Sequence, residues 1–389
     1  MIRRLKGLWH LLIAIFSLCY FRFPGRFLTV IGVTGTDGKT TTTTIIYEIL
    51  KASGIKASMI TSVHAVIGGK AYDTGFHVTT PSPFYVQKYL REAVDRGDTH
   101  MVLEVTSHGI DQHRVFGIPF AIGVLTNVTP EHLDWHKTMD RYRETKLKLL
   151  AWATYAVLNR DEKILYNQAA RAILGKKVCT YGIESGDVTP ATFHFKTNLL
   201  GMFNMYNCLA AISVGKLLEI PESTIRSAIA QFGGISGRME VVYKGAYTVV
   251  VDFAHTPNAI EKALSALRGV TKGKLIHVFG SAGLRDPYKR PLMGQASGKY
   301  ADVIILTEED YRTEDIEKIM DEIQEGIPKE KIVHRFPNRQ DAVTFALKEC
   351  KKGDVVVLTG KGHEKSLCRG TKEFPWTDQG AVKEILGKG

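Results

Sequence analysis

The first half of the chain alternates short apolar runs with segments of helical periodicity. Runs of the length expected for buried strands occur at 27–34, 101–106 and 121–128. Segments in which apolar residues recur at helical spacing occur at 40–52, 139–151 and 204–218. This order of strands and helices predicts a parallel α/β sheet.

The second half repeats this alternation after a cluster of glycines. Gly233, Gly234 and Gly237 precede a new series of strands, and we place a domain boundary there. The expected strands are 248–253, 274–280, 302–307, 331–336 and 354–359, with helical segments between them. We therefore predict a short segment at 1–28, a central P-loop ATPase-type parallel-sheet domain at 29–235 and a C-terminal Rossmann-like α/β domain at 236–389.

The N-terminal segment has basic residues on both sides of an uncharged apolar run at 11–21. The basic residues are Arg3, Arg4, Lys6, Arg22 and Arg26. The run is shorter than the ~20 apolar residues of a membrane-spanning helix, and no small-residue cleavage site of a signal peptide follows it. Two interpretations stay open: a helix that lies in the membrane interface with its basic residues on anionic headgroups, or a helix packed on the protein's own surface.

Composition and charge narrow the class of protein. The chain has 44% hydrophobic and 23% charged residues, which is ordinary for globular domains. Its net charge of +11 comes from Lys and Arg spread along the chain, so phosphorylated substrates are a simpler explanation than nucleic acid. The five cysteines are scattered, which disfavours a disulfide framework or a zinc site. We expect a monomeric cytoplasmic protein, located at the inner face of the membrane if its N-terminal helix binds lipid.

A glycine-rich loop joins the first predicted strand to the first predicted helix. It reads Gly-Thr-Asp-Gly-Lys-Thr-Thr over 35–41. At such a place, backbone N–H groups and the helix dipole can hold phosphates. Lys39 would neutralise the β- and γ-phosphates, and the Thr40 hydroxyl would bind magnesium. The general phosphate-loop spacing has a glycine where Val33 stands, so the pattern is met in part, and the alternative is a glycine turn without a nucleotide.

Acidic and imidazole side chains follow the next two predicted strands. Glu-Val-Thr-Ser-His-Gly spans 104–109, and Asn-Val-Thr-Pro-Glu-His-Leu-Asp-Trp-His spans 127–136. Because strand ends converge at one edge of a parallel sheet, Glu104 and His132 could share metal ions with the phosphates. Taken singly, such residues are more often surface or hydrogen-bonded residues.

Together these motifs resemble those of the Mur ligases, which are ATP-dependent ligases of bacterial cell-wall synthesis. Further matching motifs stand at 203–207, 236–240, 252–257, 280–291 and 360–364. They follow the order that the family has and extend from about Leu28 to the C-terminus. The resemblance is strongest to the branch that adds the third residue of the peptidoglycan stem peptide.

By position, the resemblance implies sites for ATP and for two magnesium ions. The nucleotide-binding positions are Gly35, Thr36, Gly38, Lys39, Thr40, Thr41, Asn204, Asn207, Arg238, Asp252 and His255. The catalytic positions are Lys39, Glu104, His132 and Lys146. Magnesium would be held by Thr40, Glu104, His132 and Lys146, the last as a carbamate, which is a carboxylate-like oxygen ligand. Without that modification, Lys146 would be an ordinary helix lysine.

The resemblance also implies positions for two small-molecule substrates, a UDP-muramyl peptide and an amino acid. Thr79, Thr80, Ser107 and Arg114 match positions that hold the peptide or its carrier, although 79–83 is also simply a turn. The positions for the amino acid are Arg285, Asp310, Arg312, Gly360, His363 and Glu364. In the implied reaction, ATP phosphorylates a carboxylate, and an amine then attacks the acyl phosphate.

The sequence departs from the family in two places. Mur ligases of this type carry an N-terminal domain that binds uridine diphosphate, and 28 residues cannot form one. The family segment Asp-Asn-Pro-Arg, which selects diaminopimelate, is Glu-Asp-Tyr-Arg at 309–312. Arg312 could still pair with a carboxylate, so diaminopimelate is favoured over lysine. The alternatives are an amide ligase with another acceptor, folylpolyglutamate synthase-like or lipid-linked, and a non-catalytic nucleotide-binding switch.

Overall fold

The chain folds into two compact units. The computed structural model describes residues 2–72 and 79–387. Unit 1 comprises Met1–Asn198 and Phe203–Gly233, and unit 2 comprises Leu199–Met202 and Gly234–Gly389. Residue 1 and residues 388–389, at the ends of the predicted first and last segments, lie outside the described residues, as do the side chains of Arg3, Arg4 and Lys6.

Unit 1 is built around a sheet that has eight strands within the described residues, in the order β4-β3-β2-β5-β1-β6-β7-β8. The strands are β1 Thr29–Thr34, β2 Ala57–Ile60, β3 Ala65–Ile67, β4 Lys70–Tyr72, β5 His100–Glu104, β6 Phe120–Leu125, β7 Tyr155–Asn159 and β8 Lys177–Tyr181. From β2 to β8 all neighbours pair in parallel. The predicted parallel α/β sheet is therefore confirmed, and the carboxyl ends of β1, β5 and β6 meet at one edge.

The sequence prediction placed only β1, β5 and β6 of this sheet; β2, β7 and β8 were not predicted, and two further details differ. β3 and β4 form an antiparallel edge beyond β2, and the apolar pattern misses them because three residues are too few for a recognisable alternation. β1 begins at Thr29 rather than at residue 27, because Pro24–Phe27 form a 3₁₀ turn, η1, that starts with proline.

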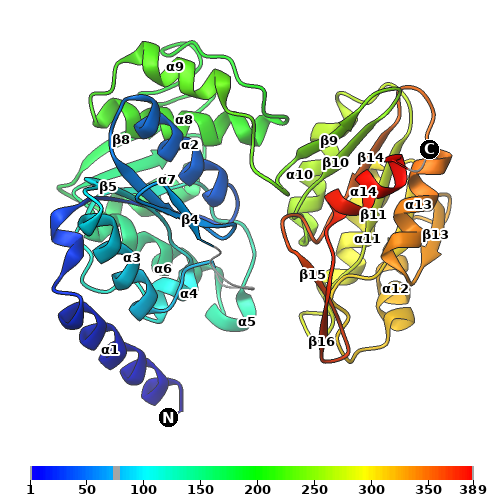
Figure 1. Ribbon diagram of the computed structural model, residues 1–389, viewed down its shortest axis with the longest axis horizontal. Helices are drawn as coiled ribbons and strands as arrows, with labels where there is room; N and C mark the ends of the chain where they lie inside the picture. The colour runs from blue at the N-terminus through cyan, green and yellow to red at the C-terminus, as the bar shows by residue number, and fades with distance from the viewer. Residues whose placement is uncertain (1, 73–78, 388–389) are drawn as a thin grey trace. The chain divides into compact units, whose positions relative to one another are not determined.

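Helices cover both faces of the unit 1 sheet (Figure 1). The helices outside unit 2 are α1 Ile2–Tyr20, α2 Lys39–Ala52, α3 Pro83–Asp95, α4 Ser107–Asp111, α5 Leu133–His136, α6 Met139–Trp152, α7 Lys163–Ala172, α8 Met202–Leu217 and α9 Glu222–Gln231. α3 and α6 share a core with Val30 of β1, to which they contribute Leu90 and Leu149. α2 packs on β1, β2 and β5 and against α9. This packing fixes the start of α2 beside the ends of β1 and β5.

The N-terminal helix α1 packs against α3. Its Ala14, Ser17 and Leu18 are buried. No helix among the described residues is both long enough and apolar enough to cross a membrane.

Unit 2 contains a six-stranded sheet, counted over the described residues, in the order β13-β12-β11-β14-β10-β9. The strands are β9 Glu240–Lys244, β10 Thr248–Val251, β11 Leu275–Phe279, β12 Val303–Thr307, β13 Ile332–Phe336 and β14 Val355–Leu358. The helices are α10 Pro257–Arg268, α11 Lys289–Tyr300, α12 Ile316–Gln324, α13 Arg339–Glu349 and α14 Asp378–Gly387. All pairs are parallel except β9 with β10, so the predicted Rossmann-like fold is confirmed. A separate hairpin, β15 Ser366–Arg369 and β16 Lys372–Pro375, was not predicted.

A fully buried histidine links three elements of unit 2. His277 of β11 pairs through Nδ1 with Ser297 Oγ at 2.8 Å and through Nε2 with Thr359 Oγ1 at 2.9 Å. Burial, and after it the charge of Arg339, lower the pKa of His277 from 6.5 to about 3. His277 is therefore neutral in the folded protein.

We expect His277 to lower the free energy of unfolding of the protein as the pH falls. Below pH 6.5 the unfolded chain binds a proton at this histidine and the folded chain does not, so the stabilisation is present above that pH and is lost as pH falls toward 3. At about pH 4.5 the loss amounts to about 3 kcal/mol. Urea unfolding at neutral pH and at about pH 4.5 measures it, with His277→Gln as the variant that does not titrate. Equal pH dependence of wild type and variant would contradict this account.

Candidate active site

The loop after β1 holds two glycines that no other residue can replace without displacing its neighbours. Gly35 has φ 154°, and a Cβ there would lie 1.8 Å from Thr126 Oγ1. Gly38 has φ 79°, and a Cβ there would lie 2.2 Å from Asn207 Oδ1. Gly38 is also the N-cap of α2, so no side chain caps the amides of the first turn, which includes Thr41. These amides and the helix dipole form a site that suits phosphate.

A carboxylate lies beside the first turn of α2. Glu104, at the end of β5, is buried, and its Oε2 accepts hydrogen bonds from Thr40 Oγ1 at 3.0 Å and from the Ser62 amide at 2.9 Å. The hydroxyls of Thr40 and Ser62 are 3.0 Å apart. The structure thus brings together the predicted pair Thr40 and Glu104. Ser62 was not predicted; its position shortly after β2, the strand next to β5, is the signal that could have found it.

A buried lysine approaches the same loop from α6. Lys146 Nζ donates to the Gly35 carbonyl at 2.5 Å and lies 4.6 Å from the centroid of the Tyr142 ring. The Tyr142 hydroxyl is 3.1 Å from Thr36 Oγ1, a contact that the sequence did not predict. Burial, and after it the charge of Lys39, hold the pKa of Lys146 well below its ordinary value. Lys146 is therefore not an ordinary helix lysine, because its amine readily gives up its proton.

His132 lies at the exposed side of this region. Its Nε2 is 3.6 Å from Glu131 Oε2, and its backbone has φ 56°. Its ring centroid lies 4.7 Å from that of His108 and 6.2 Å from that of Tyr142. Across the described residues, no group of three or more His, Cys, Asp or Glu side chains is placed to hold a metal ion. Oxygen atoms of hydroxyls and of Glu104 are the donors that the structure does gather, and they suit magnesium.

Two buried asparagines of α8 support the loop from the other side. Asn207 Nδ2 donates to Asn204 Oδ1 at 2.9 Å, and Thr42 Oγ1 of α2 donates to Asn207 Oδ1 at 3.4 Å. Asn207 therefore packs against Gly38, next to the expected phosphates.

The residues that were predicted to bind the acceptor substrate lie close together at the end of β5. Thr80 Oγ1 accepts a hydrogen bond from the Thr106 amide at 3.0 Å, and Arg114 Nη1 donates to the Thr80 carbonyl at 2.5 Å. Burial lowers the pKa of Arg114. Ser107 Oγ is 3.0 Å from Nε2 of the buried His136. Thr79 precedes Thr80 and is half-buried. These hydroxyls and this guanidinium lie next to the strand that carries Glu104.

The nucleotide positions predicted in unit 2 surround one phenylalanine. The Arg238 guanidinium lies 4.4 Å from the centroid of the Phe253 ring, and the His255 ring centroid lies 4.7 Å from it. Asp252 accepts hydrogen bonds from the amides of Met239 at 2.7 Å and of Ala254 at 2.8 Å. Burial raises the pKa of Asp252, and Arg238 opposes that rise. The structure thus brings Arg238, Asp252 and His255 together.

Three of the predicted amino-acid positions meet around a buried lysine that was not predicted. Lys361 Nζ pairs with Asp310 Oδ1 at 2.7 Å and with Glu364 Oε2 at 2.5 Å. Gly360 precedes Lys361 and has φ 101°. A Cβ there would lie 3.0 Å from Glu309 Oε2. Burial opposes the charge of Lys361, but Glu364 and Asp310 raise its pKa overall.

The other predicted amino-acid positions have different neighbours. Arg312 Nη1 donates to the Gly283 carbonyl at 2.7 Å. Arg285, two residues after Gly283, is exposed. The ring of His363 lies 5.1 Å from that of Phe253, so His363 faces the nucleotide positions of unit 2.

This geometry defines a class of protein. A phosphate loop opens α2 beside a buried carboxylate, and a second unit has the Rossmann-like fold, as in enzymes that use a nucleoside triphosphate. Two family models match the chain: Mur ligase middle domain at residues 33–215, and Mur ligase, glutamate ligase domain, at residues 237–362.

The curated relatives agree with these family models. The UDP-N-acetylmuramoyl-L-alanyl-D-glutamate–2,6-diaminopimelate ligase of Aquifex aeolicus is 38% identical over 95% of this chain and 79% of its own length. The UDP-N-acetylmuramyl-tripeptide synthetase of Deinococcus radiodurans is 36% identical over 94% of this chain and 79% of its own length. The chain belongs to the Mur ligase family of ATP-dependent amide ligases.

Solved structures show the same architecture. A UDP-N-acetylmuramoyl-L-alanyl-D-glutamate–2,6-diaminopimelate ligase is 29% identical, with a TM-score of 0.63 over 93% of this chain and 78% of that one. The folylpolyglutamate synthase of Mycobacterium tuberculosis has a TM-score of 0.72 over 96% of this chain and 94% of its own, but at 16% identity it shows the fold alone.

Proposed function

We propose that the chain joins diaminopimelate to UDP-N-acetylmuramoyl-L-alanyl-D-glutamate, with conversion of ATP to ADP and phosphate, in peptidoglycan synthesis. The observation that carries the chemistry is the assembly of the loop at 35–41, Glu104 and Lys146 in unit 1. The two substrates are those that the names of the similar ligases state.

Unit 1 would hold ATP and activate the acceptor. Lys39 Nζ lies in the loop, 2.7 Å from the Thr36 carbonyl, at the place where the β- and γ-phosphates would lie on the amides of α2. A carboxylate is a poor electrophile, so phosphoryl transfer to it creates a leaving group. Lys39 and the loop amides would stabilise the charge on the phosphoryl group during this transfer.

Magnesium fits the oxygen donors of the site. Thr40 and Glu104 would bind it, with Lys146 as a carbamate and His132 as further ligands. When bound, magnesium would neutralise negative charge on the phosphates.

The lowered pKa of Lys146 supports its modification. An uncharged amine can attack carbon dioxide, forming a C–N bond and releasing one proton, and the product is an anionic carbamate. The protonated amine has no electron pair for this step. Burial thus prepares Lys146 to become an oxygen ligand.

Unit 2 would bind the incoming amino acid. Asp310 and Glu364 carry acidic groups suited to an ammonium, and Lys361 holds both of them in place. Arg312 carries a guanidinium suited to a carboxylate, and its bond to Gly283 fixes its direction. The amine would then attack the acyl carbon and expel phosphate.

Phosphate release is the measurement that tests this proposal. The protein would be incubated with ATP, magnesium and UDP-N-acetylmuramoyl-L-alanyl-D-glutamate, with diaminopimelate, with lysine or with no amino acid. We expect release to require both the acceptor and an amino acid, and diaminopimelate to support a rate at least about tenfold above that of lysine, as a charged bidentate contact allows. Mass spectrometry would show the amide product. Phosphate release without an amide product would identify a nucleotide hydrolase or switch instead.

A further inference from the structure

The N-terminal helix α1 leaves an apolar face uncovered. Its residues Leu8, Trp9, Leu12, Ile15, Phe16 and Tyr20 are between 41% and 63% exposed. Their spacing of three and four residues places them on one side of the helix, and the buried Ala14, Ser17 and Leu18 lie on the other side. A helix at a protein surface normally exposes polar residues there, so this face marks a binding surface.

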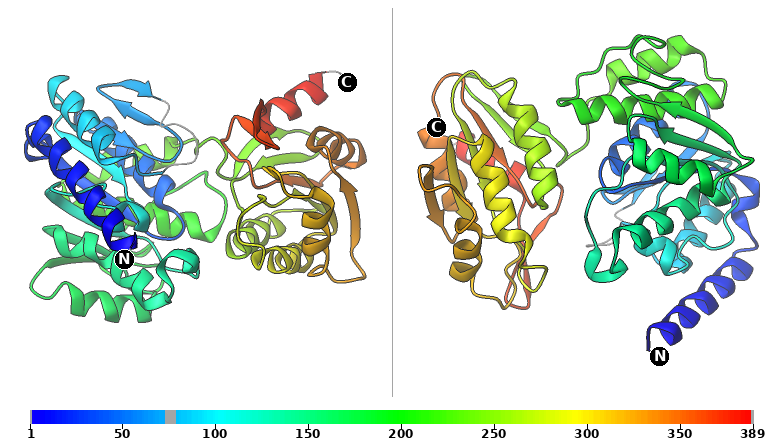
Figure 2. Two further views of the ribbon diagram at one scale, coloured as in Figure 1. Left: turned by 90° about the horizontal axis from the view of Figure 1, so that it is seen from below. Right: turned by 180° about the vertical axis from the view of Figure 1, so that it is seen from behind.

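The helix is anchored to unit 1 at one end. The side chain of Leu18 lies against Gly117, where a Cβ would come within 2.4 Å of it. The rings of Tyr20 and Phe21 lie 6.0 Å and 5.0 Å from that of Phe84 in α3. In Figure 1 and in the right view of Figure 2 the first turns of α1, in dark blue, extend away from the body of unit 1. The apolar face is thus held in a fixed direction by the folded protein.

Charge indicates what covers this face. Residues 1–36 contain Arg3, Arg4, Lys6, Arg22 and Arg26, and no Asp or Glu. The exposed face also carries Trp9, Phe16 and Tyr20, the ring types that suit a membrane–water interface. Two copies of the chain would bring like charges together on this segment, whereas an anionic lipid surface would complement them.

We propose that α1 lies in the surface of an anionic membrane, with the apolar face defined by Leu8 to Tyr20 inserted between the headgroups. In this arrangement α1 lies along the surface, as interfacial helices do. The residues of this face are not among those assigned to ATP, magnesium or the substrates, so we expect lipid binding and ligation to be independent.

Vesicle sedimentation tests the proposal. The protein would be spun with vesicles of phosphatidylcholine alone and of phosphatidylcholine with phosphatidylglycerol. We expect binding to the anionic vesicles, and at least about tenfold weaker binding for the double variant Trp9→Ser, Phe16→Ser, because two inserted rings are lost. Leu12→Lys, which places a charge in the same face, should weaken binding likewise.

The matched control replaces exposed apolar residues elsewhere in unit 1. Ile164 and Leu174 are 69% and 84% exposed, so Ile164→Ser with Leu174→Ser removes a similar apolar surface without touching α1. We expect this variant to bind vesicles as the wild type does, and all variants to keep ligase activity. Equal vesicle binding by the Trp9, Phe16 variant and the wild type would overturn the proposal. The proposal would also be overturned if the wild type did not bind vesicles and instead formed a dimer that the Trp9, Phe16 variant dissociates in light scattering. A second copy of the chain would then cover the face.

Discussion

Replacing Lys146 with alanine is expected to lower the rate of amide formation by at least about a hundredfold. The amine lies buried against the Gly35 carbonyl and the Tyr142 ring, and alanine removes both the bond and the site of carbamate formation. Phosphate release in the complete reaction measures the loss. Lys148→Ala is the matched control, because Lys148 lies on the same helix and is exposed.

The chemical basis of this effect can be separated from a loss of folding. Supplying ¹³C-bicarbonate should give the wild type and Lys148→Ala a carbamate carbonyl signal in the NMR spectrum, and Lys146→Ala should lack it. Circular dichroism should show that all three proteins are folded. Full activity of Lys146→Ala, or a wild type that is active without any carbamate signal, would contradict the role given to this lysine.

Replacing Lys39 with alanine is expected to reduce phosphate release by roughly a hundred- to a thousandfold. The ammonium is held in the loop by the Thr36 carbonyl, where in the proposed reaction it would face the charge of the transferring phosphoryl group. Its loss should act on the chemical step more than on the fold, because Lys39 lies in the first turn of α2 and is only half-buried.

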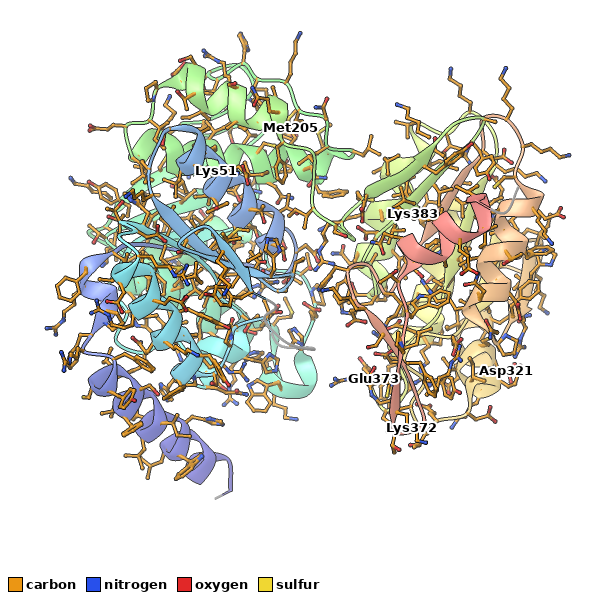
Figure 3. All side chains as sticks on the ribbon, viewed as in Figure 1. Lys51, Met205, Asp321, Lys372, Glu373 and Lys383 are labelled. Carbon is orange, nitrogen blue, oxygen red and sulfur yellow. The ribbon has the colours of Figure 1, made fainter. Side chains whose placement is uncertain are left out.

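The control for Lys39 lies on the same helix. Lys51, labelled in Figure 3, is an exposed residue in the last turn of α2. Its Nζ lies 3.5 Å from Glu48 Oε2. Lys51→Ala removes one positive charge from α2 without reaching the loop, so its activity should stay within about twofold of the wild type. If both variants lost activity equally, the net charge of the helix rather than the position of Lys39 would be responsible.

Local patterns in the sequence predicted much of the fold. The strands β1, β5 and β6 and all the parallel strands of unit 2 lie within two or three residues of the predicted ranges, because each is a short, continuous apolar run. The loop at 35–41 was also evident, since its glycines, lysine and threonines are consecutive. Strands β2, β3, β4, β7, β8 and β9 and the β15–β16 hairpin were not predicted, because each has only three to five residues and most contain polar residues that interrupt the apolar run.

The amino-acid sequence by itself indicated most of the residues to which we assign the chemistry, and the tertiary structure decided what surrounds them. Thr40 and Glu104 are 64 residues apart, and Gly35 and Lys146 are 111 apart, so their contacts depend on strand order and helix packing. The lowered pKa of Lys146 follows from burial, which a helical sequence cannot reveal. The exposed face of α1 likewise became evident only when the folded protein showed which side of the helix packs against α3 and which side faces solvent.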